Sequence, residues 1–188
     1  NPSLVAKTGR DYLSVVRDIC SLCKGPVSAE VIATDYKNML IEARRWAKVA
    51  DNVVVKIPLT EDGIRCVHDC SKEGISTNVT LCFSANQALV AAKAGASYIS
   101  PFIGRLDDVG YDGVELLQEI KNIYQNYRLP TRVLAASIRS PMHLKKLALL
   151  GVDIATIPSS VLFQLFSHPL TDNGLAKFMK DAESIPVS

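Results

Sequence analysis

Lys56 is the residue of this chain whose surroundings most suggest chemistry. It interrupts the run Val53-Val54-Val55-Lys56-Ile57-Pro58, which is otherwise typical of a strand buried on both faces. Burial disfavours the charged amine, so such a lysine finds a buried partner or loses its proton more readily than a free lysine. A neutral lysine amine can form a Schiff base with a carbonyl group, which allows carbon–carbon bonds to be broken. The alternative is a structural lysine whose head pairs with a carboxylate or reaches solvent.

Polar residues also lie near the ends of the other apolar runs. Asn78 and Thr80 are two positions apart on one predicted strand, so their side chains point to the same side of the sheet. The polar residues near predicted strand ends are Glu30, Lys56, Asn78, Thr80, Ser100, Ser137 and Arg139. Polar groups that converge from the ends of many parallel strands are typical of a barrel active site.

The elements that would position these residues alternate along the chain. Predicted strands span residues 27–33, 53–57, 77–82, 98–103, 132–137 and 154–157. Predicted helices span residues 4–23, 36–50, 61–73, 85–94, 114–125 and 141–150.

Local signals at the helix ends agree with this reading. Three glycines follow helices where a left-handed residue is favoured, and three hydroxyl residues stand where a side-chain oxygen can cap a helix N-terminus. These are Gly74, Gly95 and Gly151, and Thr60, Ser84 and Ser140. Pro141 occupies a favoured first helical position.

Apolar strands joined by crossover helices predict an α/β fold with a parallel sheet covered on both faces. An open doubly wound sheet and a closed (β/α)8 TIM barrel both satisfy this description. No glycine-rich phosphate-binding motif opens a helix, and the polar residues end many strands instead of one pair, so the barrel is favoured. The six predicted strands are two fewer than a barrel needs. Either the fold is a smaller open sheet, or an N-terminal β-α-β piece is absent from this sequence.

The composition indicates a globular protein of ordinary charge. The chain has 188 residues, 48% of them hydrophobic and 21% charged, with a formal net charge of +2. We expect a single domain over 1–188, with 160–188 as a C-terminal helical tail that breaks at Pro169. The absence of a basic block argues against nucleic-acid or membrane partners. No apolar run approaches the ~20 residues of a membrane span and no signal peptide is recognisable, so a cytoplasmic location is expected.

The five cysteines are predicted to be core residues. Cys20 with Cys23, and Cys66 with Cys70, fall on predicted helices, where spacings of three and four place side chains on one face. A metal site would need further ligands at matching spacing, and a redox site would need the first cysteine at a helix N-terminus. Neither condition is met.

Six stretches of the chain resemble one known family. They span residues 1–4, 28–31, 54–60, 74–84, 99–108 and 134–140, and read NPSL, SAEV, VVKIPLT, GISTNVTLCFS, ISPFIGRLDD and LAASIRS. In this order they resemble the transaldolases, and among them the small subfamily that also contains fructose-6-phosphate aldolase. The resemblance covers essentially the whole chain.

This resemblance implies a (β/α)8 barrel in which Lys56 forms the Schiff base. It also implies that Asn1-Pro2-Ser3 closes the second strand of the family's barrel, so that roughly the first β-α-β unit, on the order of 30 residues, is missing from this sequence. That unit carries a catalytic aspartate in the family, for which no residue here can be assigned. The resemblance implies no cofactor and no metal.

The resemblance also suggests roles for the remaining site residues. Glu30 and Phe102 match the transaldolase members, whereas the aldolase members have glutamine and tyrosine at these positions. Glu30 and Thr80 would hold a water that moves protons, unless Glu30 only pairs with Lys56 and Thr80 only packs.

Amide and hydroxyl groups for the sugar would come from Asn1, Asn78 and Ser100. Arg105, Ser137 and Arg139 would bind phosphate, although Arg105 could instead pair locally with Asp107 or Asp108.

The expected reaction transfers a dihydroxyacetone unit from sedoheptulose 7-phosphate to glyceraldehyde 3-phosphate. Its products are erythrose 4-phosphate and fructose 6-phosphate, in the non-oxidative pentose phosphate pathway. The alternatives are an aldolase that releases free dihydroxyacetone and a non-catalytic sugar-phosphate-binding barrel. The partners expected are phosphorylated sugars and other copies of this chain. The resemblance implies a ring-shaped homo-oligomer, such as a decamer of two pentamers, in which the tail reaches across to a neighbouring subunit. His68, His143 and His168 are predicted to have no catalytic role.

Overall fold

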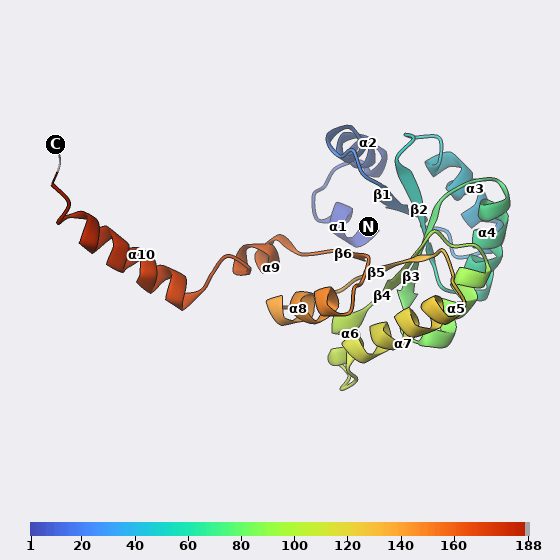
Figure 1. The fold of residues 1–188 in the computed structure, drawn as a ribbon. Coiled ribbons are helices and arrows are strands. Elements are labelled where there is room, and N and C mark those ends of the chain that lie inside the picture. Colours follow the sequence, from blue (N-terminus) through green and yellow to red (C-terminus); the bar gives the residue numbers. More distant parts are fainter. Residues whose placement is uncertain (187–188) are drawn as a thin grey trace.

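The computed structural model describes residues 1–186 and contains a parallel sheet of six strands. The strands are β1 (Val27–Glu30), β2 (Val53–Pro58), β3 (Thr77–Cys82), β4 (Tyr98–Pro101), β5 (Arg132–Ala135) and β6 (Ile154–Ala155). Each strand pairs with the next one along the chain, in the order β1-β2-β3-β4-β5-β6. A doubly wound sheet reverses its strand order at a switch point, so this order excludes that alternative. The prediction of an α/β fold is confirmed, and the strands form a curled partial barrel (Figure 1).

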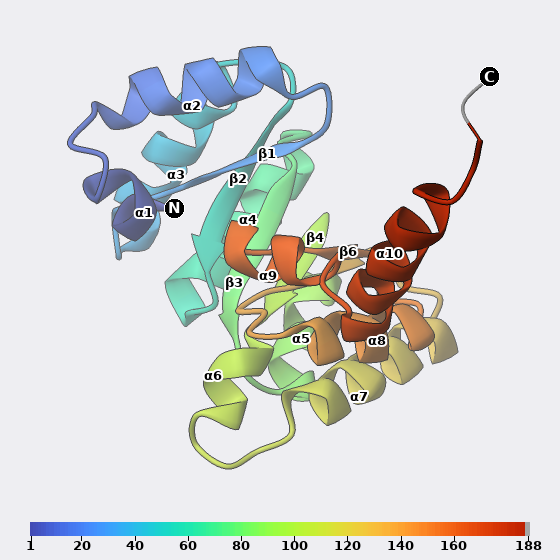
Figure 2. The same cartoon turned by 90° about the vertical axis from the view of Figure 1, so that its left-hand side faces the viewer.

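The chain also forms helices, most of which lie around the outside of this sheet (Figures 1 and 2). In chain order they are α1 (Pro2–Ala6), α2 (Tyr12–Leu22), α3 (Tyr36–Trp46), α4 (Glu61–Lys72), α5 (Ala85–Lys93), α6 (Ile103–Asp107), α7 (Gly113–Asn126), α8 (Pro141–Leu149), α9 (Ser159–Gln164) and α10 (Pro169–Ala182). The five helices predicted between residues 36 and 150 are confirmed, with ends that differ by up to four residues.

The single helix predicted over residues 4–23 is wrong, because two helices occupy this stretch. Gly9 lies between them with φ of +65°, a conformation that helical residues do not adopt. Asp11 then starts α2 by accepting a hydrogen bond from the Ser14 amide. The bend places α1 beside the carboxyl ends of the strands, where Asn1 contacts Glu30.

The predicted strand over 98–103 is also too long. β4 ends at Pro101, and the chain turns at Phe102 directly into the short helix α6. An apolar run that continues past a strand does not reveal this turn, since Ile103 is buried in α6 as it would be in a strand.

The predicted helix caps are confirmed. Gly74, Gly95 and Gly151 have φ values of +72°, +93° and +65°. The hydroxyl oxygens of Thr60, Ser84 and Ser140 accept hydrogen bonds from amides in the first turns of α4, α5 and α8. These caps fix where each helix begins after its strand, and therefore the length of the loop that carries the strand-end residues.

The core lies between the sheet and the helices. Val55, Val79 and Ile99 from the strands are buried together with Met39 and Leu117 from the helices. The strand residues in this core point outward to the helices. The residues that alternate with them along each strand therefore point to the concave side of the sheet.

The cysteine prediction holds only in part. Cys66, Cys70 and Cys82 are buried, whereas Cys20 is partly exposed and Cys23 is exposed. The prediction of a core residue is wrong for Cys23 because α2 ends one residue earlier, at Leu22, so the helical face no longer directs this side chain inward.

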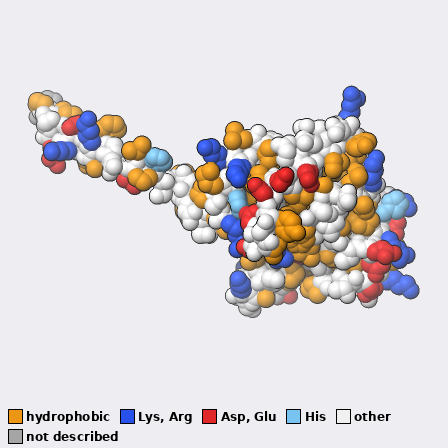
Figure 3. Space-filling view, turned by 90° about the horizontal axis from the view of Figure 1, so that it is seen from below, with side chains coloured by type: hydrophobic (Ala, Val, Ile, Leu, Met, Phe, Trp, Pro, Cys, Tyr) orange, Lys and Arg blue, Asp and Glu red, His pale blue; other side chains and the backbone are white. Residues whose placement is uncertain are grey.

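The C-terminal tail leaves the body of the molecule. The predicted pair of tail helices divided at Pro169 is present as α9 and α10, and α10 extends into solvent without a buried residue (Figures 1 and 3). Residues 187 and 188 of the predicted tail lie outside the described residues. Among residues 1–186, no helix combines the length and apolar character needed to cross a membrane.

Candidate active site

Lys56 lies near the carboxyl end of β2 and pairs with Glu30 at the end of β1. The two residues are register partners on adjacent strands, so their side chains leave the sheet side by side. Lys56 Nζ is 2.9 Å from Glu30 Oε2, and the side chains are only 13% and 15% exposed. The amine is therefore held inside the molecule beside a carboxylate that can accept a proton from it.

Asn1 and Tyr12 hold Glu30 in place. Asn1 Nδ2 donates a hydrogen bond of 3.0 Å to Glu30 Oε2, the oxygen that also faces Lys56. The Tyr12 hydroxyl accepts from the Glu30 amide at 2.7 Å and donates to the Glu30 carbonyl at 3.0 Å. Burial raises the pKa of the Tyr12 phenol, which favours its neutral, donating form. These contacts satisfy both backbone groups of Glu30 on the unpaired side of β1.

Asn78 lies beside Lys56 on the sheet and forms the centre of a buried polar chain. Asn78 is the register partner of Lys56 on β3. The Ser100 hydroxyl donates to Asn78 Oδ1 at 2.7 Å, and Asn78 Nδ2 donates to Ser28 Oγ at 3.0 Å. The chain spans β1, β3 and β4 and places hydroxyl and amide groups along the concave side of the sheet.

Thr80 is fully buried, and its hydroxyl oxygen has no hydrogen-bond partner among the described residues. A buried hydroxyl without a partner is uncommon, since it loses its bonds to water and gains none in return. Leu81, the next residue, has φ of +60°, in the left-handed region that non-glycine residues rarely occupy. Strain of this kind concentrates at functional sites, so the end of β3 is a candidate for one.

Phe102 and Arg105 lie together after β4. The guanidinium carbon of Arg105 is 4.8 Å from the centre of the Phe102 ring, a cation–π contact. In the part of the chain that the structure describes, Arg105 forms no ion pair with Asp107 or Asp108. The local pairing considered for Arg105 is therefore absent, and its charged group remains exposed.

Ser137 and Arg139 lie between β5 and α8. Ser137 has φ of +61°, a second strained residue at a strand end. Ser137 also lines a cavity of about 490 Å³ together with Leu4 of α1 and with residues 156–159 after β6. Arg139 donates from Nη2 to Asp108 Oδ2 at 2.9 Å, and this ion pair is exposed.

Sequence reasoning did not identify several residues that support this site. Ser28, Tyr12, Asp107 and His143 contact predicted site residues or the loops that carry them. Only Ser28 had a usable signal, since it precedes Glu30 by two positions and therefore points to the same side of the sheet.

The arrangement combines an amine, a carboxylate, hydroxyls and amides on one side of the sheet, and exposed guanidinium groups on the loops after β4 and β5. Such a set can bind a polyhydroxylated, phosphorylated carbonyl compound and move protons on it. The predicted residues come from the N-cap of α1, from β1 through β4, from the turn into α6 and α6 itself, and from the segment between β5 and α8.

Solved structures of other proteins share this fold. A structure of inosine 5'-monophosphate dehydrogenase from Legionella pneumophila aligns with a TM-score of 0.59 and 16% identity, over 80% of this chain and 49% of that one. A mandelate oxidase variant aligns with a TM-score of 0.55 and 17% identity, over 76% of this chain and 51% of that one. These likenesses support the architecture alone.

Closer relatives are found by sequence. A protein of Leptospira biflexa named "Probable transaldolase" is 58% identical over 185 residues, covering 98% of this chain and 86% of the relative. One of the same name from Methanococcus maripaludis is 59% identical over 184 residues, covering 98% and 86%. The family model described as "Transaldolase/Fructose-6-phosphate aldolase" matches residues 1–186. The chain therefore belongs to the transaldolase/fructose-6-phosphate aldolase family.

Proposed function

We propose that this chain is a transaldolase that transfers a dihydroxyacetone unit from sedoheptulose 7-phosphate to glyceraldehyde 3-phosphate. The observation that carries the proposal is the enclosed contact of 2.9 Å between the Lys56 amine and Glu30, at the strand ends of a member of this family. A carboxylate in contact with the amine can take up its proton, which leaves the lone pair that attacks a ketone.

The proposed reaction proceeds through covalent intermediates on Lys56. The amine adds to the C2 ketone of sedoheptulose 7-phosphate, and water leaves to give an iminium ion. The C3–C4 bond then breaks, its electron pair moves into the iminium, and erythrose 4-phosphate departs. The three-carbon enamine attacks the aldehyde of glyceraldehyde 3-phosphate, and hydrolysis of the new iminium releases fructose 6-phosphate and restores the amine.

Glu30 and Thr80 are proposed to hold the water that carries protons in these steps. The Thr80 hydroxyl is buried without a protein partner, so it is available to bind water. Glu30 Oε2 is engaged by Lys56 and Asn1, and Oε1 has no partner among the contacts described for residues 1–186. Asn1, Asn78 and Ser100 are proposed to bind the sugar hydroxyls, with Asn78 exchanging an existing hydrogen bond for one to substrate.

Arg105, Ser137 and Arg139 are proposed to bind the substrate phosphate. Guanidinium groups pair with phosphate through two parallel hydrogen bonds, and the N-terminus of α8, whose dipole favours an anion, begins just after Arg139. Arg139 already shares one nitrogen with Asp108, which leaves its remaining donors for the phosphate.

Reductive trapping tests the proposed chemistry directly. Incubation with fructose 6-phosphate and sodium borohydride is expected to add one substrate-derived unit to the protein, located on Lys56 by peptide mass spectrometry. Lys56→Met is expected to abolish both the label and the activity, whereas Lys145→Met, an exposed lysine on α8, should keep both. Labelling that persists in Lys56→Met would refute the assignment.

Measuring dihydroxyacetone release with and without an acceptor aldehyde decides between transfer and simple aldol cleavage. Glu30 and Phe102 match the transaldolase members of the family, so free dihydroxyacetone should form only slowly from fructose 6-phosphate without an acceptor aldehyde. Rapid release without an acceptor would establish the aldolase activity instead. If Lys56 is labelled but no sugar phosphate is converted to product, only a binding role would remain.

The chain is further proposed to supply six strands of a (β/α)8 barrel within a ring-shaped homo-oligomer. The consecutive order of its six parallel strands is that of a barrel. The exposed tail helix α10 carries Leu175, Phe178 and Met179 on one apolar stripe, none of them buried. A stripe of this kind is stabilised by burial against another surface, for which a neighbouring subunit is proposed.

A further inference from the structure

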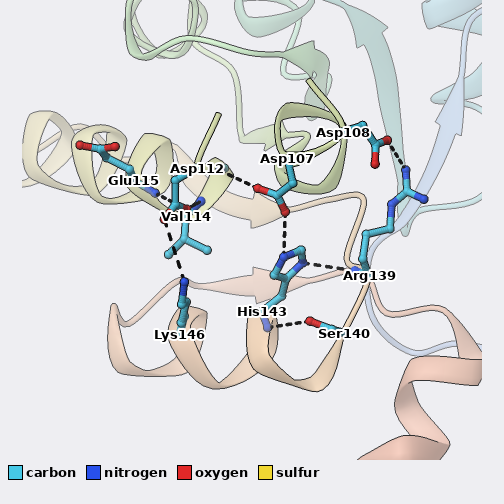
Figure 4. A network of polar contacts seen from close by, with 10 residues as sticks. Asp107, Asp108, Asp112, Val114, Glu115, Arg139, Ser140, His143 and Lys146 are labelled. Carbon is cyan, nitrogen blue, oxygen red and sulfur yellow. Dashed lines mark hydrogen bonds and ion pairs between the residues drawn. The ribbon is translucent and has the colours of Figure 1, made fainter. Parts of the chain in front are cut away.

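A network of polar contacts joins α6 to the segment that carries Arg139 (Figure 4). His143 Nε2 is 2.8 Å from Asp107 Oδ2, and Asp107 Oδ1 accepts from the Gly113 amide at 3.0 Å. The Arg139 amide donates to His143 Nδ1 at 3.3 Å. Asp107 therefore links the end of α6, the start of α7 and the start of α8.

These contacts define the hydrogen-bonding role of each imidazole nitrogen. Nδ1 accepts from the backbone amide of Arg139, and Nε2 faces the Asp107 carboxylate as a donor. The His143 side chain is mostly buried, and its own amide is bonded to Ser140 Oγ at the N-cap of α8. The ring is thus fixed at both nitrogens and at its backbone.

Backbone packing at Gly104 brings the same two segments close together. The Gly104 amide donates to the Ser137 carbonyl at 3.1 Å. A Cβ atom at Gly104 would lie 2.2 Å from the Ser137 oxygen and 2.6 Å from Arg139 Cγ. The stem of Arg139 therefore lies directly against α6, the helix that carries Arg105.

We propose that Asp107 and His143 are positioning residues of the phosphate site. The pair holds the Arg139 segment against α6, so that the guanidinium groups of Arg105 and Arg139 are placed to bind one phosphate group. Neither Asp107 nor His143 needs to touch the substrate for this role. This inference rests on the proposed function, because the substrates that test it are those of the proposed reaction.

The two arginines need such a device because they come from different β-α units. Arg105 follows β4 and Arg139 follows β5, and each side chain is long, flexible and exposed. A pair of donors binds phosphate best when their separation is set before binding, since ordering them afterwards costs conformational entropy. Asp108 adds a contact to the Arg139 side chain itself, while Asp107 and His143 fix the backbone beneath it.

The test compares a phosphorylated acceptor with its unphosphorylated counterpart. With sedoheptulose 7-phosphate as donor, at a concentration that saturates each variant, kcat and KM are measured for glyceraldehyde 3-phosphate and for glyceraldehyde. Asp107→Ala and His143→Ala are each expected to raise KM for glyceraldehyde 3-phosphate about tenfold, with kcat and the glyceraldehyde reaction within about twofold. The double variant should be no worse than either single variant, because the two residues act as one unit.

Binding of inorganic phosphate, measured by calorimetry, separates this inference from the proposed reaction. The dissociation constant should rise about tenfold in both single variants and remain unchanged in Lys145→Ala, an exposed position on the same helix. Weaker phosphate binding in variants of a protein that proves inactive with both acceptors would support the inference while refuting the proposed function. The inference would be overturned if kcat/KM fell equally with both acceptors, or if the dissociation constant for phosphate did not change.

Discussion

Lys56 has a carboxylate partner, and this partner decides what its amine can do. A lysine enclosed without a counter-charge would be costly, whereas Glu30 at 2.9 Å compensates its charge and can also receive its proton. The structure thus contains the ion pair that the structural alternative for Lys56 requires. The same ion pair is also a suitable starting state for Schiff-base formation, so pairing and catalysis are compatible roles of one contact.

Thr80 can be tested by a substitution that preserves its shape. Thr80→Val removes a buried hydroxyl that has no protein partner, so the melting temperature should stay the same or rise. If the hydroxyl holds a proton-carrying water, kcat should fall about a hundredfold. Thermal unfolding and steady-state transfer assays measure the two effects.

Thr131→Val is the matched control for this test. The Thr131 hydroxyl is buried and donates to the Ala96 carbonyl at 2.7 Å, just before β5 and therefore at the opposite, amino-terminal end of the strand. Its loss should lower the free energy of unfolding by about 1–3 kcal/mol and leave kcat unchanged. A fall in kcat for Thr131→Val as large as that for Thr80→Val would remove the catalytic role of Thr80.

The exposure of the cysteines predicts the order in which a thiol reagent modifies them. Burial raises the pKa of the Cys82 thiol to about 12, so at pH 8 this thiol remains protonated and inaccessible in the folded protein. Cys23 is exposed and should react first with a disulfide reagent such as Ellman's reagent. Cys66, Cys70 and Cys82 should react only after unfolding in denaturant, as mass spectrometry of the labelled peptides would show. Fast labelling of Cys82 in the native protein would contradict the burial described here.

At the scale of elements, β1 to β4 each carry a candidate site residue, and the segments after β4 and β5 carry the others. β4 illustrates this division, because Ser100 lies within the strand while α6, immediately after it, carries Arg105 and contacts the next unit. A helix of five residues gains little stability from its own hydrogen bonds. Its position depends on packing, since Ile103 and Gly104 are both buried.

Gly104 offers a test of that packing. Gly104→Ala would place a methyl group against the Ser137 carbonyl and the stem of Arg139, and the two segments would have to separate. We expect a loss of about 1–3 kcal/mol in unfolding free energy and a higher KM for phosphorylated acceptors. Chemical denaturation and acceptor kinetics measure these changes.

Gly174 is the matched control for the Gly104 substitution. It lies in the exposed helix α10, and a Cβ atom there would meet nothing within 4 Å. Gly174→Ala should therefore be neutral, or stabilise the helix by up to about 1 kcal/mol. A Gly104→Ala variant as stable and active as Gly174→Ala would show that the contact between α6 and the Arg139 segment is dispensable.

At the scale of the whole molecule, α10 is the feature that the single chain leaves unexplained. The helix stands apart from the body, and its apolar side chains face solvent (Figure 3). Phe178 is 71% exposed, although a phenylalanine gains about 1.5–3 kcal/mol when it is fully buried. Packing of α10 on a neighbouring copy in the proposed oligomer would bury the Phe178 side chain.

Phe178→Lys tests the role of the tail. The substitution should lower the oligomeric state measured by light scattering, because a charge would replace an apolar contact in the proposed interface. Lys177→Ala, a polar neighbour on the same helix, should leave the assembly intact. An unchanged molecular mass for Phe178→Lys at micromolar concentration would exclude α10 from the interface.

The sequence by itself determined the α/β class, the strand positions, most helix boundaries and the residues near the strand ends. These features depend on local patterns, such as the alternation of apolar residues and the capping groups Thr60, Ser84 and Ser140, which act over a few positions. Residue spacing also placed Asn78 and Thr80 on one side of the sheet. Recognition of the family came from whole motifs in order along the chain.

Only the tertiary structure decided which side chains meet. The contacts of Glu30 with Lys56 and of Asp107 with His143 join residues 26 and 36 positions apart. The turn into α6 was likewise not predicted, because the apolar run continues through it. The break near Gly9 was missed although Gly9 and Asp11 are local signals for the end of one helix and the start of another. Contacts between distant residues depend on strand register, sheet curvature and loop path, which arise when the whole core packs and which no local pattern encodes.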